Sequence, residues 1–315
     1  MTVAGVILAK PRGFCAGVDR AIEIVEQALE FYDKPVYVRK EIVHNRHVVE
    51  ALQAQGAVFV DELEEVPDGS TVIFSAHGVA PSVWAQAQQK NLRIIDATCP
   101  LVTKVHMEVQ RYAKKDFTIV LIGHEEHDEV IGTRGEAPNR IQVISTEEDV
   151  INLQVPDPDK VVCLTQTTLS MDDTAAIIAA LRAKYPTMIT PAKDDICYAT
   201  QNRQQAVKAM ANLVDLVLVL GASNSSNSNR LREVAETAGV RAVLINQARD
   251  ITPDILEGVK RVGITAGAST PEFLVQEAIV YCQQMGAETI QELTVVEEHV
   301  KFLLPPELTS ARSET

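Results

Sequence analysis

Short runs of β-branched and other apolar residues alternate in this chain with longer stretches in which apolar residues recur at helical spacing. This alternation is typical of α/β layers built on mainly parallel strands. The apolar runs predict strands at 6–9, 36–39, 71–75, 93–97, 118–122, 142–145, 161–165, 216–220, 242–245 and 261–265. The helical spacing predicts helices at 17–31, 46–55, 101–114, 174–184, 202–213, 229–238 and 271–283. Polar residues follow most of the strands, and in open α/β sheets ligands bind at that edge.

A threefold repeat runs through this pattern. Cys15, Cys99 and Cys197 each end or follow an extended run and precede a helix-like stretch. A polar cluster stands 28 or 29 residues after each cysteine, namely His44-Asn45, His127-Asp128-Glu129 and Ser225-Ser226-Asn227. A second polar element stands 62 to 72 residues after each cysteine, namely Ser75-Ala76-His77-Gly78, Thr165-Gln166-Thr167-Thr168 and Thr265-Ala266-Gly267-Ala268-Ser269. A repeat places equivalent positions around a common axis, so the three thiols are candidate ligands of one metal centre.

The repeat divides the chain into three predicted α/β lobes, at 15–97, 98–195 and 196–282. In this division the N-terminal strand within 1–14 belongs with the first lobe, and 283–315 form a C-terminal accessory segment. The predicted fold is three similar small α/β lobes with mainly parallel sheets, arranged with pseudo-threefold symmetry. A chain of 315 residues is long enough for two or three small domains.

Composition excludes some partners. The net charge of −14 argues against general nucleic-acid binding, which needs a basic face, but it is compatible with one small anionic ligand. No apolar run approaches the ~20 residues of a membrane span, and the chain does not start with a signal or transit pattern, so we expect a cytoplasmic protein. Five cysteines without an export signal do not predict a disulfide framework. Cys163 and Cys282 lie inside apolar runs and are expected to be buried structural thiols.

The three repeated cysteines stand where a thiolate is favoured. The unpaired N–H groups and the positive dipole end of a following helix stabilise the anionic form, which metal ligation requires. Zinc and an iron–sulfur cluster are both compatible with such ligands. Structural zinc sites usually contain closely spaced cysteine pairs, and this sequence has none, which favours iron–sulfur. Three thiolates can hold three irons of a [4Fe–4S] cluster and leave the fourth open as a Lewis acid.

Polar residues at the repeating positions form a candidate substrate pocket. They are His44, His77, His127, Thr167, Ser225, Asn227 and Ser269. The Ser/Asn-rich stretch 221–230 follows an apolar run and opens a helix, a context that suits a phosphate, while no nucleotide motif is present. Glu129 is the acid best placed to donate a proton. On the residues alone, a zinc- or thiol-dependent hydrolase and a non-catalytic iron–sulfur sensor remain alternatives to an iron–sulfur reductase.

Several long motifs stand in order along the chain. They read Pro11-Arg12-Gly13-Phe14-Cys15-Ala16-Gly17-Val18-Asp19-Arg20-Ala21, Glu41-Ile42-Val43-His44-Asn45, Phe74-Ser75-Ala76-His77-Gly78-Val79, Asp96-Ala97-Thr98-Cys99-Pro100-Leu101-Val102, Thr165-Gln166-Thr167-Thr168-Leu169-Ser170, Asp195-Ile196-Cys197-Tyr198-Ala199-Thr200 and Ser225-Ser226-Asn227-Ser228-Asn229-Arg230. These motifs resemble the 4-hydroxy-3-methylbut-2-enyl diphosphate reductases, the family of the last enzyme of the non-mevalonate isoprenoid pathway. The resemblance spans about residues 6 to 304. One departure is visible, because the family often has His-Pro-Glu where this chain has Asp128 between His127 and Glu129.

The resemblance implies three lobes around a [4Fe–4S] cluster held by Cys15, Cys99 and Cys197. It implies reductive loss of an allylic hydroxyl, bound at the open iron, with two electrons and two protons, to give isopentenyl and dimethylallyl diphosphates. By the same resemblance, proton delivery falls to Glu129, Thr167 and His127. The implied diphosphate-binding residues are His44, His77, His127, Thr167, Ser225, Ser226, Asn227 and Ser269. A reduced ferredoxin or flavodoxin is the implied electron donor, and neither nucleic acid nor membrane is an implied partner.

Overall fold

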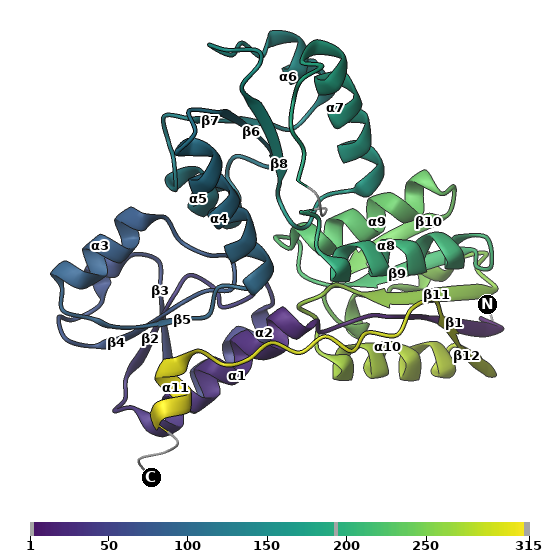
Figure 1. Ribbon diagram of the computed structural model, residues 1–315. Coiled ribbons are helices and arrows are strands. Elements are labelled where there is room, and N and C mark those ends of the chain that lie inside the picture. Colours follow the sequence, from purple (N-terminus) through teal and green to yellow (C-terminus); the bar gives the residue numbers. More distant parts are fainter. Residues whose placement is uncertain (1–2, 192–194, 312–315) are drawn as a thin grey trace. The chain divides into compact units, whose positions relative to one another are not determined.

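The computed structural model describes residues 3–191 and 195–311 (Figure 1). The chain forms two compact units. The first unit combines the chain up to Val18 with His44–Val48 and Tyr198–Lys301. The second unit combines Asp19–Val43, Val49–Cys197 and the chain from Phe302.

The second unit contains two parallel sheets, of which the first-lobe sheet has the order β3-β2-β4-β5. Its strands are β2 (Val36–Arg39), β3 (Ala57–Val60), β4 (Thr71–Phe74) and β5 (Arg93–Asp96). The helices along this part of the chain are α1 (Ala16–Phe31), α2 (Arg46–Gln55), the short η1 (Leu63–Glu65) and α3 (Pro81–Gln89). β4 is buried along its whole length, as expected for an inner parallel strand covered on both faces.

The second-lobe sheet has the order β7-β6-β8, and a single bridge from Val162 to Ile189 extends it beyond β8. Its elements are α4 (Pro100–Ala113), β6 (Thr118–Ile122), α5 (Asp128–Gly135), β7 (Ile141–Ile144), α6 (Glu147–Asn152), β8 (Val161–Thr165) and α7 (Met171–Lys184). Successive side chains of β6 point to opposite faces. Ile119 and Leu121 pack with residues of α4, whereas Val120 and Ile122 pack with residues of α7.

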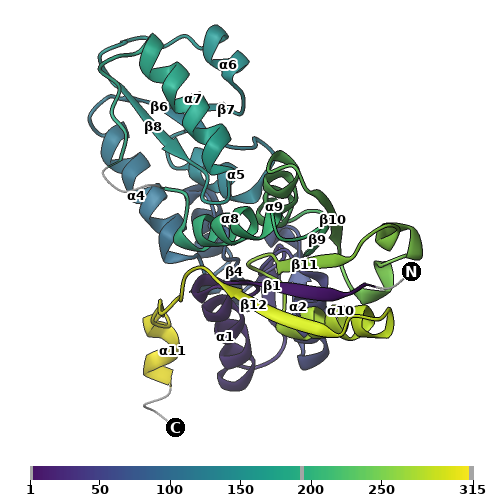
Figure 2. The same cartoon turned by 90° about the vertical axis from the view of Figure 1, so that its right-hand side faces the viewer.

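The first unit contains the third-lobe sheet, with the order β10-β9-β11-β1-β12 (Figure 2). Its strands are β1 (Gly5–Lys10), β9 (Leu216–Leu220), β10 (Arg241–Ile245), β11 (Arg261–Ala266) and β12 (Thr289–Thr294). The helices are α8 (Tyr198–Ala211), α9 (Ser226–Thr237), the short η2 (Ala248–Asp250) and η3 (Pro253–Leu256), and α10 (Glu272–Gln284). Val217 and Val219 pack beneath α8 and α9, and the leucines that alternate with them in β9 pack beneath α10.

The three parallel sheets with their helices confirm the predicted α/β fold class. Every predicted strand forms, with ends within one residue of the prediction, and every predicted helix forms with ends within four residues. Sequence analysis missed β3, β12, α3, α5, α6 and α11 (Pro306–Ala311). These elements are short, and β12 is an edge strand with mostly exposed residues, so neither the β nor the helical pattern is pronounced in them.

The N-terminal strand lies in a different sheet from the one expected. The sequence analysis groups it with the first lobe, whereas β1 pairs in parallel with β11 and β12 in the third-lobe sheet. The segment after residue 283, expected to be accessory, supplies β12 to the same sheet. The lobe boundaries at 97/98 and 195/196 stay a prediction.

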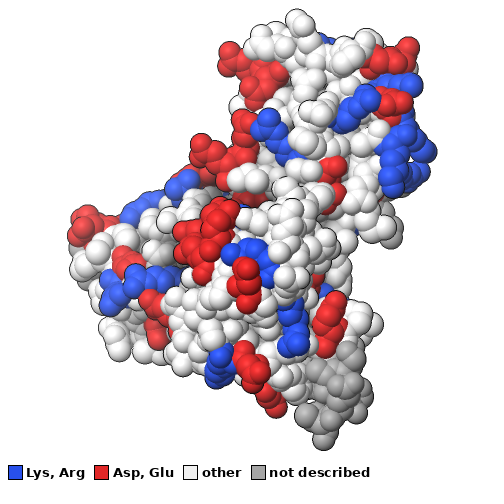
Figure 3. All heavy atoms as spheres, turned by 90° about the vertical axis from the view of Figure 1, so that its left-hand side faces the viewer, with Lys and Arg blue, Asp and Glu red and all other residues white. Residues whose placement is uncertain are grey.

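No helix among residues 3–191 and 195–311 is long and apolar enough to cross a membrane. On the face shown in Figure 3, lysines and arginines are intermingled with aspartates and glutamates.

Candidate active site

The first polar cluster of each repeat caps a helix at the carboxyl end of a strand. Side-chain atoms of Asn45, His127 and Ser225 accept hydrogen bonds from backbone N–H groups in the first turns of α2, α5 and α9, at 3.0, 3.1 and 3.3 Å. Local sequence explains the geometry, because Asn and Ser are preferred N-caps and each follows the end of a buried strand. The N-terminus of a helix offers unpaired N–H groups and positive potential, so these positions suit anionic ligand groups.

Each repeated cysteine is anchored by its own backbone to a second polar element. The hydrogen bonds run from Cys15 N to Ala268 O at 3.3 Å, from Cys99 N to Ala76 O at 3.0 Å and from Cys197 N to Thr167 O at 3.0 Å. The three bonds are equivalent, which supports the threefold repeat at the level of single backbone atoms. Cys99 and Cys197 are bonded to the second polar element that precedes them in the chain, and Cys15 is bonded to the last such element, near the other end of the chain.

The three cysteine side chains fit a metal cluster chemically. They are half-buried thiols, and they stand directly before α1, α4 and α8. By contrast, burial raises the pKa of the Cys163 thiol to about 12 and that of Cys282 to about 11, and both are enclosed in the core as predicted. Cys15 belongs to the first unit and the other two belong to the second, so their convergence stays a prediction.

A buried carboxyl group lies in the second unit. Glu129, in the first turn of α5, is 3% exposed. Its Oε1 accepts from the backbone N–H of Thr167 at 2.6 Å, and its Oε2 accepts from the Thr167 hydroxyl at 2.9 Å. Burial raises the pKa of the Glu129 carboxyl to about 7, and the two hydrogen bonds from Thr167 oppose that rise. The group can therefore both hold and release a proton near neutral pH.

Two histidines lie beside this group. Nδ1 of His127 accepts from the Glu129 N–H, so a neutral His127 carries its proton on Nε2 and can donate it. The ring of His77 meets the ring of His127 edge-on, with 5.8 Å between their centroids. Nδ1 of His77 is also 3.3 Å from the Ser75 hydroxyl. The structure thus brings together four of the predicted site residues: His77, His127, Glu129 and Thr167.

The first unit groups the remaining predicted polar residues around the end of β11. Ser269 donates through its hydroxyl to the backbone carbonyl of His44 at 2.9 Å. The side-chain oxygen of Asn227 accepts from Ala268 N at 2.9 Å, and Asn227 and Ser225 are both almost fully buried. Ser226, the third member of the cluster, is the first residue of α9. His44, Ser225, Ser226, Asn227 and Ser269 therefore share one region of this unit.

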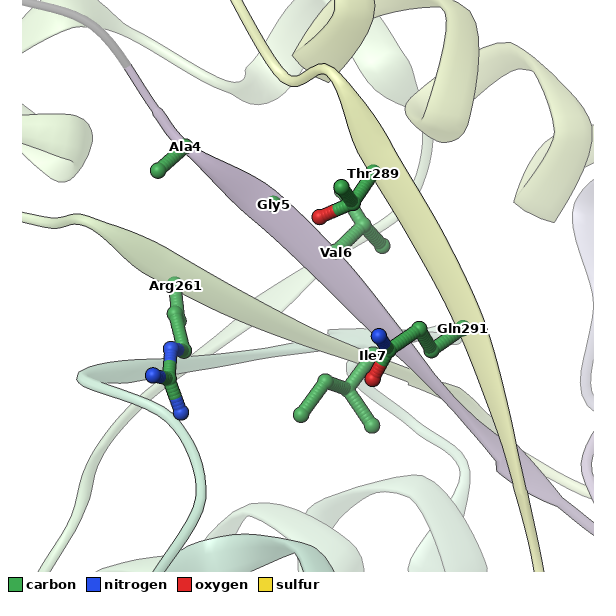
Figure 4. A pocket seen from close by; sticks show the side chains of 7 residues that line it. All are labelled: Ala4, Gly5, Val6, Ile7, Arg261, Thr289 and Gln291. Atoms are coloured by element: carbon green, nitrogen blue, oxygen red, sulfur yellow. The ribbon is translucent and has the colours of Figure 1, made fainter.

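Two surface pockets lie away from these residues. One, of about 260 Å³, lies over the starts of β1, β11 and β12 and includes Arg261, Thr289 and Gln291 (Figure 4). The other, of about 490 Å³, lies between η2 and α10. Neither pocket is lined by a predicted site residue.

Comparison with known proteins decides the family. The model of the LytB protein family matches residues 6–283. The chain belongs to the LytB protein family.

Relatives and solved structures of this family match almost the whole chain. A 4-hydroxy-3-methylbut-2-enyl diphosphate reductase of Aromatoleum aromaticum is 56% identical over 303 residues, which cover 96% of this chain and 97% of the relative. The reductase of Mycolicibacterium paratuberculosis is 57% identical over 308 residues, covering 98% and 93%. The solved E-1-hydroxy-2-methyl-but-2-enyl-4-diphosphate reductase of Plasmodium falciparum is 41% identical, with a TM-score of 0.94 and 99% coverage of both chains. LytB family reductases use a [4Fe–4S] cluster, which decides between the iron–sulfur and zinc alternatives.

The departure from the LytB pattern has a physical explanation. Asp128 is the first residue of α5, directly after the N-cap His127. Proline is favoured at that position because it has no N–H to leave unpaired, and aspartate is favoured there by the helix dipole. Either residue can begin the helix, and His127 still caps it through its ring. The cap and the Glu129 contacts are therefore formed with aspartate in this place.

Some residues next to the site were not found by sequence reasoning. Asp195 is buried, and its carboxylate accepts from Thr165 N at 3.1 Å and from the Lys104 ammonium at 2.9 Å. This contact ties the segment before Cys197 to α4, which begins after Cys99. Arg203 is fully buried in the first unit. Asp195 stands in one of the motifs that carry the resemblance, but its contacts were not predicted. No local pattern distinguishes Arg203 from arginines on exposed helix faces, so the sequence offered no signal for its burial.

Proposed function

We propose that this chain converts (E)-4-hydroxy-3-methylbut-2-enyl diphosphate to isopentenyl diphosphate and dimethylallyl diphosphate. In this reaction the allylic C–O bond breaks, and two electrons and two protons are taken up as the hydroxyl leaves as water. The observation that carries the proposal is the buried Glu129–Thr167 pair, in which burial raises the pKa of the carboxyl group to about 7, in a chain of the LytB family.

Cys15, Cys99 and Cys197 are the proposed ligands of the [4Fe–4S] cluster. Three half-buried thiols, each at the start of a helix, offer the anionic sulfur ligands that such a cluster requires. When bound, the cluster supplies single electrons and a Lewis-acidic iron. The burial of Cys163 and Cys282 among apolar residues argues against this role for them.

Glu129 is the proposed proton donor, with Thr167 as the group that relays the proton. A protonated Glu129 can turn its O–H toward the Thr167 hydroxyl, which is 2.9 Å away and can accept as well as donate. The backbone N–H of Thr167 can only donate, so it holds the other oxygen of Glu129 in place. His127, whose Nδ1 accepts from the Glu129 backbone N–H, can donate through Nε2–H. A proton delivered to a departing oxygen lowers the barrier because hydroxide is a poor leaving group.

The proposed diphosphate-binding residues are His44, His77, His127, Thr167, Ser225, Ser226, Asn227 and Ser269. Their imidazole, hydroxyl and amide groups lie at or beside the starts of α2, α5 and α9, where the helix N-terminus favours an anion. Neutral donors suit a chain with a net charge of −14, because they bind phosphate without a general basic surface.

The proposed electron donor is a reduced ferredoxin or flavodoxin, since the chain has no flavin or nicotinamide motif. We also propose that the protein works in the cytoplasm, where such one-electron carriers are found.

Anaerobic purification followed by counting iron and sulfide, together with turnover using a one-electron donor, tests this function. We expect close to four irons per chain and formation of both five-carbon diphosphates. A colourless, zinc-loaded protein would contradict the cluster. A brown protein that does not turn over the hydroxylated diphosphate would instead identify a non-catalytic iron–sulfur protein.

A further inference from the structure

Arg203 is a fully buried cation inside the first unit, with 0% of its surface exposed. It lies on α8, the helix that begins directly after Cys197. An arginine without polar partners is strongly disfavoured in a protein interior, so the groups that it contacts indicate its role.

The guanidinium of Arg203 binds the backbone just before Cys15. Nε and Nη2 donate to the carbonyl of Gly13 at 3.2 and 2.7 Å, and Nη2 also donates to the carbonyl of Phe14 at 3.2 Å. Nη1 donates to Ala199 O at 3.0 Å, within α8 itself. Two consecutive carbonyl groups before the cysteine are thus satisfied by a single side chain.

The N–H groups of the same loop are held from the opposite side. Gly13 N donates to Ala266 O at 3.1 Å, and Cys15 N donates to Ala268 O at 3.3 Å. Gly13 has φ +67, a conformation that favours glycine. The backbone that presents the Cys15 thiol is therefore fixed between the end of β11 and the Arg203 guanidinium.

Glu298 supplies the negative charge that Arg203 needs in this buried place. Its carboxylate oxygens are 3.1 and 3.3 Å from Nη1 of Arg203, and the side chain is 15% exposed. Asn202 donates to the same carboxylate at 3.0 Å. Glu298 follows β12 in the segment that the sequence analysis treats as accessory, so this segment is linked through Arg203 to the Cys15 loop.

We propose that Arg203 and Glu298 are positioning residues that hold the Cys15 thiol in its ligating orientation. The inference rests on the proposed role of Cys15 as a cluster ligand. Loss of an outer partner that orients a metal ligand typically lowers metal affinity by about tenfold to a hundredfold. Removing the guanidinium also takes its donors away from the buried Gly13 carbonyl and the partly buried Phe14 carbonyl, which frees the loop to move.

The test compares five variants under anaerobic conditions by the rate at which a ferrous chelator removes iron from the loaded protein. We expect Arg203→Met to release iron at least about tenfold faster than the unmodified protein. Arg203→Lys restores part of the retention, because an ammonium can still reach one carbonyl group. We expect Glu298→Gln to release iron at a rate between those of the two Arg203 variants, since its amide keeps the hydrogen bond and loses the charge.

Met210→Ala is the matched control, since Met210 is also fully buried on α8 and its sulfur lies near Gly263 rather than near the Cys15 loop. We expect this variant to lose thermal stability and yet release iron at the unmodified rate. The electron paramagnetic resonance spectrum of the one-electron-reduced protein should change in Arg203→Met and not in the control. A general loss of stability would not move that spectrum.

The inference is overturned if a folded Arg203→Met protein keeps its iron, or if Met210→Ala releases iron equally fast at the same loss of Tm. If Arg203→Met does not fold, Arg203→Lys and Glu298→Gln decide in the same assay. Cys15→Ser separates this result from the proposed function. If Cys15→Ser retains all its iron, the ligand assignment is wrong. If Cys15→Ser loses its iron while the Arg203 and Glu298 variants retain theirs, the ligand assignment stands and only the positioning role is wrong.

Discussion

Replacing Glu129 by glutamine tests whether a buried carboxyl group delivers the proton. The two side chains have nearly the same shape, and the glutamine carbonyl can still accept from the Thr167 N–H while its amide donates to the Thr167 hydroxyl. Glutamine cannot lose or gain a proton near neutral pH. The change therefore removes the proton and leaves the packing of α5 largely intact.

The size of the effect on stability follows from the pKa of Glu129, which burial raises from 4.5 to about 7. Each pH unit corresponds to about 1.4 kcal/mol, so ionising the buried group costs the folded state on the order of 3 kcal/mol. Because the folded pKa is raised, the stabilising contribution is fully present below about pH 4.5 and is lost as the pH rises through about 7. The glutamine variant has no such contribution to lose.

Two measurements check this reasoning. The free energy of unfolding of each protein is measured with urea from about pH 5 to about pH 8.5. Over this range the unmodified protein should lose roughly 2 to 3 kcal/mol relative to the variant. At neutral pH, kcat should fall by about a hundredfold or more, with unchanged iron content. The unmodified kcat should decline above about pH 7, as the acid ionises. Near-normal turnover in the variant, or a stability difference that does not depend on pH, would refute the role of Glu129.

Three other changes follow from the same structure. Thr167→Val removes the hydroxyl that lowers the pKa of Glu129. We therefore expect kcat to fall about tenfold or more, and the decline of kcat at alkaline pH to move to higher pH. Thr167→Ser keeps the hydroxyl and should be close to normal in both respects. Cys99→Ser should lose most of its iron while Cys163→Ser, a change of a core thiol, keeps it; equal iron loss in an elemental assay would undo the ligand assignment. Ser225→Ala should raise KM about tenfold and lower the free energy of unfolding by ~1 kcal/mol through the lost cap of α9; an unchanged KM would remove Ser225 from the diphosphate site.

The sequence predicted those strands and helices in which the pattern of apolar residues is consistent along the whole element. β9 reads Leu-Val-Leu-Val-Leu and is buried on both faces, so its pattern leaves little choice of structure. The start of α2 at residue 46 was predicted, and Asn45 caps it, whereas α5, which His127 caps, was missed. The pairing of Glu129 with Thr167 was implied by the family resemblance rather than by spacing.

The parts that the sequence did not predict depend on contacts between residues far apart in the chain. Arg203 contacts a loop 190 residues away, and β12 forms because β1 offers it a free edge to pair with. Neither contact leaves a local trace, since an arginine on a helix and a polar strand at a sheet edge are both compatible with solvent exposure. Long-range partners of this kind require coordinates.

The position of β1 changes the meaning of the threefold repeat. In the first lobe β4 is paired with β5, and Cys99 follows β5. In the second lobe Val162 of β8 forms a bridge with Ile189, and Cys197 comes after Ile189 in the chain. In the third, β11 is paired with β1, and Cys15 follows β1. Each cysteine therefore follows a segment that is paired with the strand before one polar element, and its backbone N–H is bonded to Ala76, Thr167 or Ala268 in that element. The third-lobe sheet takes β1, and with it the segment before Cys15, from the opposite end of the chain. The spacing in sequence singled out all three cysteines, but it grouped each of them with the polar element that follows it in the chain rather than with the one to which its backbone is bonded.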